Sequence, residues 1–134
     1  MKKYETFSHA KVKLRYHIIF STKFRRRCLD GVENELKDSL KYVESVSDFK
    51  IENIGIDGDH IHLIVRSRPS MSVSSIVRRL KQITTRQMWK KCNEHLSRFY
   101  YERMRGKLWT NGYFCCTLGD VSSRIVEKYV ENQG

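Results

Sequence analysis

Residues 59–65 constrain this chain more than any other stretch, because two histidines alternate there with apolar residues. In a β-strand alternate side chains point to the same face, so His60, His62 and Ile64 would share one face. The other face, with Ile61 and its alternate neighbours, would be wholly apolar and would seal a core. Same-face neighbours lie only ~6.6 Å apart along a strand, so both imidazoles could bind one divalent cation. A purely structural pair of histidines is the alternative.

The segments on either side of this stretch predict the rest of a sheet and two helices. Asp57-Gly58 predicts a tight hairpin that joins a strand at 49–56 to the histidine strand. Alternation of apolar residues predicts further strands at 14–21 and 113–118. Helical spacing predicts one helix up to about residue 47, capped by Asp30 and Glu33, and a second helix after Ser70 or Ser72. Residues 95–105 have weaker periodicity, typical of a helix tail or a loop.

The order of these elements predicts an α+β fold of the ferredoxin-like or RRM-like type. Its βαββαβ plan places two helices on one face of a four-stranded antiparallel sheet. An extra C-terminal helix is predicted at 120–133, and the histidine face of the sheet is left for it to approach. The length predicts a single domain over 1–134, with a basic N-terminal arm at 1–13.

The charge of the chain predicts a polyanionic partner. Lys and Arg total 26 against 15 Asp and Glu, for a formal charge of +11, and residues 61–93 contain no carboxylate before Glu94. Such a surplus in a small domain favours nucleic acid over a scattered surface charge. In the basic stretch 23–27, cations around Phe24 could hold phosphates while the ring stacks on a base. A solvated run of charge is the alternative for that stretch.

Other sequence features bear on the compartment. No apolar run reaches the length of a membrane helix, and the N-terminal residues lack the apolar core of a signal peptide. The four cysteines have no CxxC or metal-finger spacing. These features predict a cytoplasmic protein with reduced thiols and no membrane partner.

The predicted last helix places Tyr129 and Gln133 one turn apart on one face, at i and i+4. If Gln133 carried its amide oxygen to a histidine-bound metal, the Tyr129 hydroxyl would lie beside that metal. A tyrosine oxygen can attack a phosphodiester, and a divalent metal can stabilise the charge that develops. Taken singly, the tyrosine could serve packing and the glutamine could be an ordinary polar residue at a helix end.

The combination resembles the single-tyrosine HUH transposases of small insertion sequences, which move as single-stranded DNA. The resemblance is carried by His60-Ile61-His62 and by the Tyr-x-x-x-Gln spacing of residues 129–133. It extends over nearly the whole chain, including residues 16–20 and 108–111. It implies that Tyr129 is the nucleophile and forms a 5′-phosphotyrosine. It also implies that His60, His62 and Gln133 bind Mg²⁺ or Mn²⁺.

The resemblance further implies a homodimer that binds subterminal DNA hairpins, in which the tyrosine helix can complete the partner's histidine site. Asp59 would either support His60 or end the hairpin of the sheet. The candidate DNA contacts are Arg25, Arg26, Arg78, Arg79 and Arg86. The alternatives are a domesticated relative that processes chromosomal hairpin repeats, a non-enzymatic nucleic-acid-binding domain on the same fold, and a metal-dependent nuclease that uses water.

Overall fold

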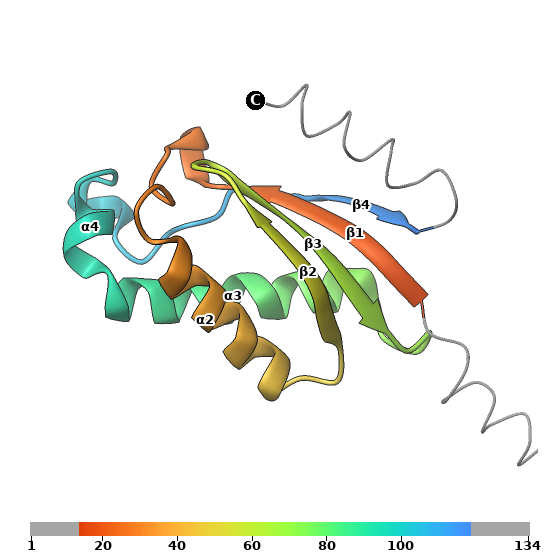
Figure 1. Cartoon of the computed structure of the whole chain (residues 1–134). Helices are drawn as coiled ribbons and strands as arrows, with labels where there is room; N and C mark the ends of the chain where they lie inside the picture. The colour runs from red at the N-terminus through yellow and green to blue at the C-terminus, as the bar shows by residue number, and fades with distance from the viewer. Residues whose placement is uncertain (1–13, 119–134) are drawn as a thin grey trace, which may run out of the picture.

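Four strands pair into one antiparallel sheet in the computed structural model of this chain, which describes residues 14–118 (Figure 1). The strands are β1 (Leu14–Ser21), β2 (Lys50–Ile56), β3 (His60–Ser67) and β4 (Phe114–Thr117). Their order across the sheet is β2-β3-β1-β4, so β1 and β3 are the two inner strands. The predicted α+β fold with a four-stranded antiparallel sheet is confirmed. The predicted arm at 1–13 and the predicted helix at 120–133 lie outside the described residues.

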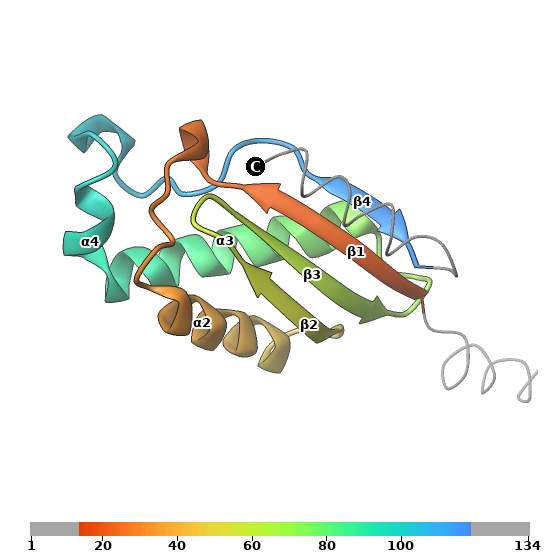
Figure 2. The ribbon, with the colours of Figure 1, turned by 45° about the horizontal axis from the view of Figure 1, so that its top comes forward.

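Two long helices cover one face of this sheet. They are α2 (Glu33–Ser45) and α3 (Val73–Lys91), which lie side by side below the sheet in Figure 1; in Figure 2 α3 passes behind the strands and α2 lies below β2. Three short helical segments complete the described chain: η1 (Lys23–Arg25), α4 (Asn93–Ser97) and η2 (Glu102–Met104). Residues 95–105, with their weak periodicity, therefore contain the end of α4 and the single turn η2.

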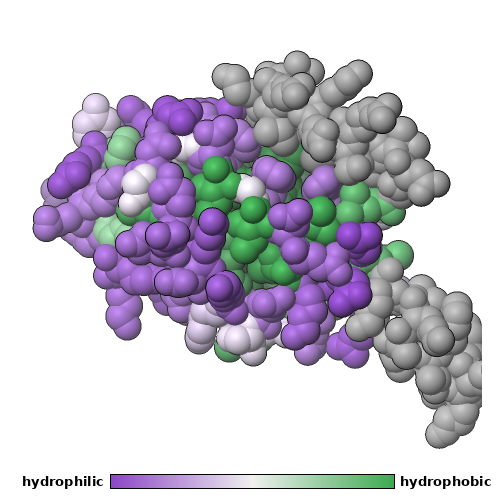
Figure 3. Space-filling view, viewed as in Figure 1, coloured by the Kyte–Doolittle hydropathy of each residue, from purple (hydrophilic) through white to green (hydrophobic). Residues whose placement is uncertain are grey.

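The core lies between the sheet and the two long helices. From the inner strands, Ile18, Ile61 and Leu63 have no exposed surface, and they meet apolar side chains of both helices, among them Leu36, Leu40, Ile76 and Leu80. Hydrophilic residues cover the end of the molecule that carries α4 and η1, and hydrophobic residues gather along the sheet (Figure 3). No helix within residues 14–118 is long and apolar enough to cross a membrane. All four cysteines are free thiols.

The ends of the helices test the capping predictions. Ser72 caps α3, since its hydroxyl oxygen accepts a hydrogen bond from the Ser75 amide at 3.2 Å. The predicted Asp30 cap is wrong, because α2 begins at Glu33 and its N-cap residue is Val32. Asp30 is instead bound to Arg27, with Nε and Oδ2 3.0 Å apart, which holds its carboxylate away from the helix end.

The hairpin between β2 and β3 forms as predicted, but its turn is shifted by one residue. Ile56 pairs with Ile61, and the Asp57 amide donates to the His60 carbonyl at 2.9 Å. The two enclosed residues are therefore Gly58 and Asp59 rather than Asp57 and Gly58. A Cβ at Gly58 would lie 2.6 Å from the Arg27 guanidinium carbon, so this glycine lets the Arg27 side chain cross the turn.

Candidate active site

Strand β3 separates its residues between the two faces of the sheet. Ile61, Leu63 and Val65 have no exposed surface and face α2 and α3. His60 and His62 alternate with them and therefore lie on the opposite face. Because β3 pairs with β1 on one side and β2 on the other, both histidines stand on a strand with neighbours on each side. The predicted sharing of one face by the two histidines agrees with this geometry.

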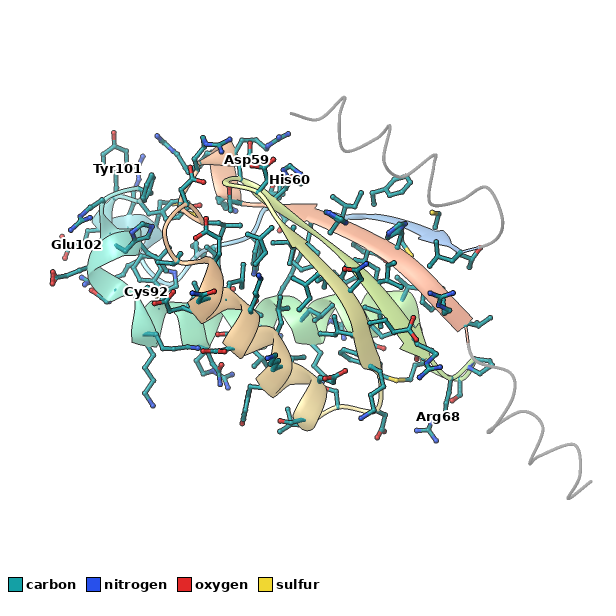
Figure 4. All side chains as sticks on the ribbon, in the orientation of Figure 1. Asp59, His60, Arg68, Cys92, Tyr101 and Glu102 are labelled. Atoms are coloured by element: carbon teal, nitrogen blue, oxygen red, sulfur yellow. The ribbon has the colours of Figure 1, made fainter. Side chains whose placement is uncertain are left out.

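His60 is buried and is oriented by the residue before it. It is only 2% exposed, and its Nδ1 lies 2.8 Å from Oδ1 of Asp59. The other carboxylate oxygen of Asp59 accepts a hydrogen bond from Nε of Arg25 at 3.0 Å. Figure 4 shows Asp59 and His60 together where β3 begins, on the side of the sheet away from α2 and α3. With Nδ1–H donated to a carboxylate, Nε2 is the ring nitrogen of His60 that can bind a cation.

The Asp59 carboxyl stays ionised in this arrangement. Burial acts to raise its pKa, but the hydrogen bonds with His60 and Arg25 and the charge of Arg25 outweigh burial and lower the pKa below its usual value. An ionised carboxylate is the state that accepts both hydrogen bonds. Asp59 therefore supports His60 as well as ending the hairpin, so both roles considered from the sequence apply.

His62 is half-buried, and its ring lies across strand β2. A Cβ built on Gly55, its cross-strand partner, would come within 1.9 Å of Nε2 of His62. Only a glycine at position 55 leaves room for the imidazole in this position. The ring also makes an edge contact with His17, with centroids 6.2 Å apart and planes inclined by 66°.

His17 is a third histidine on this face, and it was not among the predicted site residues. It lies on β1, its cross-strand partner on β3 is Ile64, and its side chain is buried. Alternation within residues 14–20 already placed His17 opposite Tyr16 and Ile18. Antiparallel pairing of that strand with the histidine strand was the signal that could have added His17 to the group.

The two imidazoles on β3 fit part of a divalent metal site. Within residues 14–118, no three His, Cys, Asp or Glu side chains are grouped so that they could hold a metal ion. His60 and His62 would thus supply two nitrogen donors, and further donors would have to come from elsewhere. Tyr129 and Gln133, predicted to complete the site, lie outside the described residues. In the described structure the fit rests on the bond from Asp59 to His60 and on the space that Gly55 leaves for His62.

The five predicted DNA contacts fall into two separate groups. Arg25 and Arg26 lie at η1, beside Asp59, and the Arg26 guanidinium is 5.9 Å from the centroid of the Phe24 ring. Arg78, Arg79 and Arg86 lie on α3, in the layer on the opposite side of the sheet from His60. The five arginines do not form one continuous surface around the histidines.

Arg79 already has partners within the fold. Its Nε donates to the Ser47 hydroxyl at 2.6 Å, and its Nη2 donates to the carbonyl of Val46. Both partners follow the last turn of α2, where carbonyls lack partners within the helix. Arg79 therefore ties α3 to the end of α2, whereas no such bond is found for Arg78 or Arg86 in the described part of the chain.

A basic groove of about 630 Å³ lies between α3 and residues 106–111. Its cationic lining comes from η1, α3 and the segment before β4: Lys23, Lys81, Arg86 and Lys107. Lys81 donates to the carbonyls of Thr110 and Gly112 at 2.8 and 2.7 Å, and burial lowers its pKa. Sequence reasoning missed Lys107, because its place beside Arg86 depends on how residues 106–111 return to α3.

The Leu108-Trp109-Thr110-Asn111 stretch joins that groove to the sheet. Trp109 donates from Nε1 to the Thr84 hydroxyl at 2.9 Å and packs edge-on against Phe20, with centroids 4.8 Å apart. Trp109 also forms an isolated β-bridge with Thr22, just beyond β1. These contacts fix the position of η1 relative to α3, so the stretch organises the surroundings of the site.

Comparisons with known proteins agree on one family. Residues 10–133 match the model of the family described as "Transposase IS200 like". The ISDra2 transposase TnpA of Deinococcus radiodurans is 26% identical over 121 residues, which cover 90% of this chain and 84% of the relative. The transposase for insertion sequence element IS200 of Salmonella typhimurium is 26% identical over 130 residues, covering 96% and 82%.

Solved structures share the fold. A crystal structure from Deinococcus radiodurans assigned as a transposase superposes with a TM-score of 0.75 at 28% identity, covering 91% of this chain and 92% of that one. A REP-associated tyrosine transposase bound to a REP hairpin superposes with a TM-score of 0.58 at 14% identity, covering 85% and 61%. The second likeness concerns the fold alone.

Proposed function

The chain belongs to the IS200-like transposase family, and we propose that it cleaves and rejoins single-stranded DNA at the ends of an insertion element. The observation that carries the proposal is the placement of His60 and His62 on one face of β3, with Asp59 bonded to Nδ1 of His60. Two imidazoles held on a sheet face away from the packed helices are suited to binding a cation at a phosphate. A domain that only stacks nucleic acid on its sheet would have no use for this arrangement.

The proposed reaction begins with the Tyr129 hydroxyl, which loses its proton and attacks a DNA phosphorus. A bond forms between the tyrosine oxygen and phosphorus, and the bond from phosphorus to the 3′ oxygen breaks. The products are a 5′-phosphotyrosine and a free 3′-hydroxyl, which takes up a proton. Attack by another 3′-hydroxyl on the phosphotyrosine reverses these changes and joins the strands without a nucleotide cofactor.

His60, His62 and Gln133 would hold Mg²⁺ or Mn²⁺, which when bound polarises the scissile phosphate. With Nδ1–H donated to Asp59, His60 would offer Nε2 to the cation. Arg25 holds the second oxygen of Asp59 and so fixes the carboxylate. Of the described residues, Asp59 and Arg25 position a ligand and do not touch the reacting atoms.

The proposed substrate is DNA with hairpins near the element's ends. The REP-associated relative was solved with a hairpin bound, and the groove lined by Lys23, Arg86 and Lys107 offers this chain a basic surface for a phosphate backbone. We further propose a ferredoxin-like topology in which the helix at 120–133 carries Tyr129, and a homodimer in which that helix can reach the partner's histidines.

The test is an adduct assay with hairpin DNA that carries a single-stranded flank. The protein is incubated with this DNA and Mg²⁺ or Mn²⁺, and a denaturation-resistant protein–DNA adduct is sought on a gel. The adduct is expected with the natural protein, and it should disappear with EDTA, with Tyr129→Phe and with His60→Ala. Tyr42→Phe, which changes an exposed tyrosine on α2, is the matched control and should leave the adduct unchanged.

Cleavage that persists in Tyr129→Phe would refute the tyrosine mechanism and favour a water-using nuclease. Hairpin binding should survive in His60→Ala, because the histidine is proposed to act on the phosphate at the cleavage point. Parallel loss of cleavage and binding in that variant would indicate a structural histidine.

A further inference from the structure

Two aromatic side chains far apart in sequence lie together at the surface near η1. Among the described residues, Phe24 and Tyr101 are the two most exposed large hydrophobic side chains, at 63% and 71%. Both line one hollow of about 150 Å³, to which Arg26 and Arg103 also contribute. Exposed aromatic rings have no packing role in the core, so their shared position requires another explanation.

The backbone at Phe24 is held in an unfavourable conformation. Phe24 and Arg25 have φ values of 59° and 53°, in the left-handed region that residues with a Cβ rarely adopt. Hydrogen bonds around η1 maintain this conformation: the Lys23 amide donates to the Leu108 carbonyl at 2.8 Å, and the Thr22 hydroxyl donates to the Arg26 carbonyl at 2.6 Å. Such strain persists where surrounding structure enforces it, and it is common at functional sites.

Tyr100 and Tyr101 are adjacent in sequence, but the first is buried and anchors the segment while the second is exposed. Tyr100 is 5% exposed, and its hydroxyl donates to the Lys23 carbonyl at 3.1 Å, which fixes η1 to the segment after α4. Tyr101 projects outward from that end of the molecule (Figure 4). Anchoring through Tyr100 therefore holds the Phe24 and Tyr101 rings around the same hollow.

The charges around the hollow suit a phosphate backbone. The Arg26 guanidinium lies over the Phe24 ring, and Arg103 completes the cationic lining. Glu102 is the neighbouring acid; it does not line this hollow but a second one, which Tyr101 shares with it and with Arg105. Aromatic rings between cations are the arrangement with which proteins bind single strands, since every base offers a π-face for stacking.

We propose that Phe24 and Tyr101, with Arg26 and Arg103, form a stacking site for an unpaired base in the single strand that leads to the histidines. The proposal rests on the proposed function for its substrate. Its place follows from Arg25, the residue after Phe24, which bonds Asp59 and through it His60. A DNA strand whose base stacks on Phe24 would continue along η1 toward His60, on the face of the sheet where the phosphate would be cleaved.

The test measures binding without cleavage. In a Tyr129→Phe background, a fluorescent oligothymidine of about 12 nucleotides, within the site sizes of single-strand-binding folds, is titrated by anisotropy. The double variant Phe24→Gly, Tyr101→Leu is expected to bind it between about fivefold and 100-fold more weakly, and Tyr101→Phe is expected to bind normally. Binding of a blunt duplex of the same length should be unchanged, because its bases are not free to stack.

Phe24→Gly has a second readout. Glycine adopts a positive φ without strain, so its unfolding midpoint should equal or exceed that of the natural protein while single-strand binding falls. A lowered midpoint with normal binding would assign the ring to packing and overturn the proposal. Tyr42→Leu, which removes an exposed tyrosine from α2, is the matched control; an equal loss of binding there would also overturn it.

The two proposals fail in different ways. An adduct at Tyr129 together with unchanged oligothymidine binding in the double variant would refute the stacking site and leave the transposition chemistry intact. The absence of any adduct together with weakened single-strand binding would refute the chemistry and leave a single-strand-binding site. Equal weakening for single strand and duplex would show that the two rings do not select unpaired bases, and it would overturn the stacking site.

Discussion

Alternate residues of strand β3 serve two differently built regions of the molecule. Ile61, Leu63 and Val65 lie beneath α2 and α3 and are held by apolar packing from several elements. His60 and His62 face the other way; among the described residues, Asp59 bonds the first, and Gly55 and His17 lie against the second. On the packed face many apolar contacts together stabilise the fold, while on the histidine face the described contacts with Asp59 and Gly55 orient individual rings. Substitutions on the histidine face should therefore change cleavage, whereas substitutions on the packed face should change the free energy of unfolding.

The sharpest separation of the two faces comes from neighbouring positions 62 and 63. His62→Ala should abolish cleavage while changing the free energy of unfolding by about 1 kcal/mol or less, because the ring is only half-buried. Leu63→Ala removes a fully buried side chain and should lower the free energy of unfolding by about 2–5 kcal/mol. Urea unfolding and adduct formation, measured on both variants below the unfolding transition, check the pair. Equal destabilisation by the two changes would contradict the division between the faces.

Gly55→Ala tests whether one contact decides the position of the His62 ring. The added methyl would occupy the space of the imidazole, so the ring must turn away. A catalytic group displaced by about 1 Å can cost on the order of 100-fold in rate, so cleavage should fall between about tenfold and 100-fold. The stability should change little, because a side chain moves and the strand remains paired.

The matched control for Gly55→Ala is Asn53→Ala on the same strand. Asn53 is exposed, and its cross-strand partner is Ile64, on the same face of β3 as His62. It should cleave at the normal rate. Normal cleavage by Gly55→Ala as well would show that the His62 ring is not held where the glycine leaves space.

The sequence predicted the packed face more completely than the histidine face, for a physical reason. Strand alternation within 14–20 and 60–65 and the helical spacing after Ser72 are local patterns, and the packing of the sheet follows from them. The same alternation also placed His60 and His62 together. The neighbours of His62 come from two other strands, and the register that puts Gly55 and His17 beside it is set by the whole sheet.

Two sequence predictions meet contacts that they did not include: the Asp30 cap is wrong, and Arg79 as a DNA contact stays a prediction. The Asp30 cap was a sound local pattern, but Arg27 binds the carboxylate and Gly31, at φ 89°, turns the chain before α2 starts at Glu33. Arg79 looked like an exposed cation on a basic helix, but the end of α2 lies within its reach. Arg27 binds Asp30 at the local spacing i, i+3, which competes with the cap, whereas Arg79 reaches Ser47 across the fold, a contact that local spacing does not reveal.

Asp59→Asn tests a smaller contribution to the histidine face. The amide keeps the size of the side chain but cannot accept from His60 and Arg25 with two equivalent charged oxygens. Loss of such a supporting carboxylate typically costs about 10–100-fold in metal affinity or activity. Cleavage should fall by this amount, and additional Mn²⁺ should restore part of it. Unchanged metal dependence would show that Asp59 serves only the hairpin.

The loss of unfolding free energy in Asp59→Asn should depend on pH, and the direction of this dependence follows from the pKa of Asp59. The pKa of Asp59 is lower in the folded protein than its usual value of 3.8, so between the two values the unfolded chain binds more protons. The stability that the carboxylate contributes is therefore complete above pH 3.8 and is lost as the pH falls through the folded value. The difference in unfolding free energy between the natural protein and Asp59→Asn should shrink below about pH 4.

The smallest expected effects separate two arginines of α3 that the sequence treated alike. Arg79→Ala should lower the free energy of unfolding by about 1 kcal/mol, because it removes hydrogen bonds to Ser47 and Val46, with little change in DNA binding. Arg86→Ala, in the basic groove, should leave stability unchanged and weaken hairpin binding. The slope of log K against log salt should fall by about 0.9 for one lost phosphate contact. An equal fall in slope for Arg79→Ala would show that Arg79 gives up its bonds to Ser47 and Val46 and contacts a DNA phosphate instead. That outcome would extend the DNA-binding surface across the helix layer, on the side of the sheet opposite the histidines.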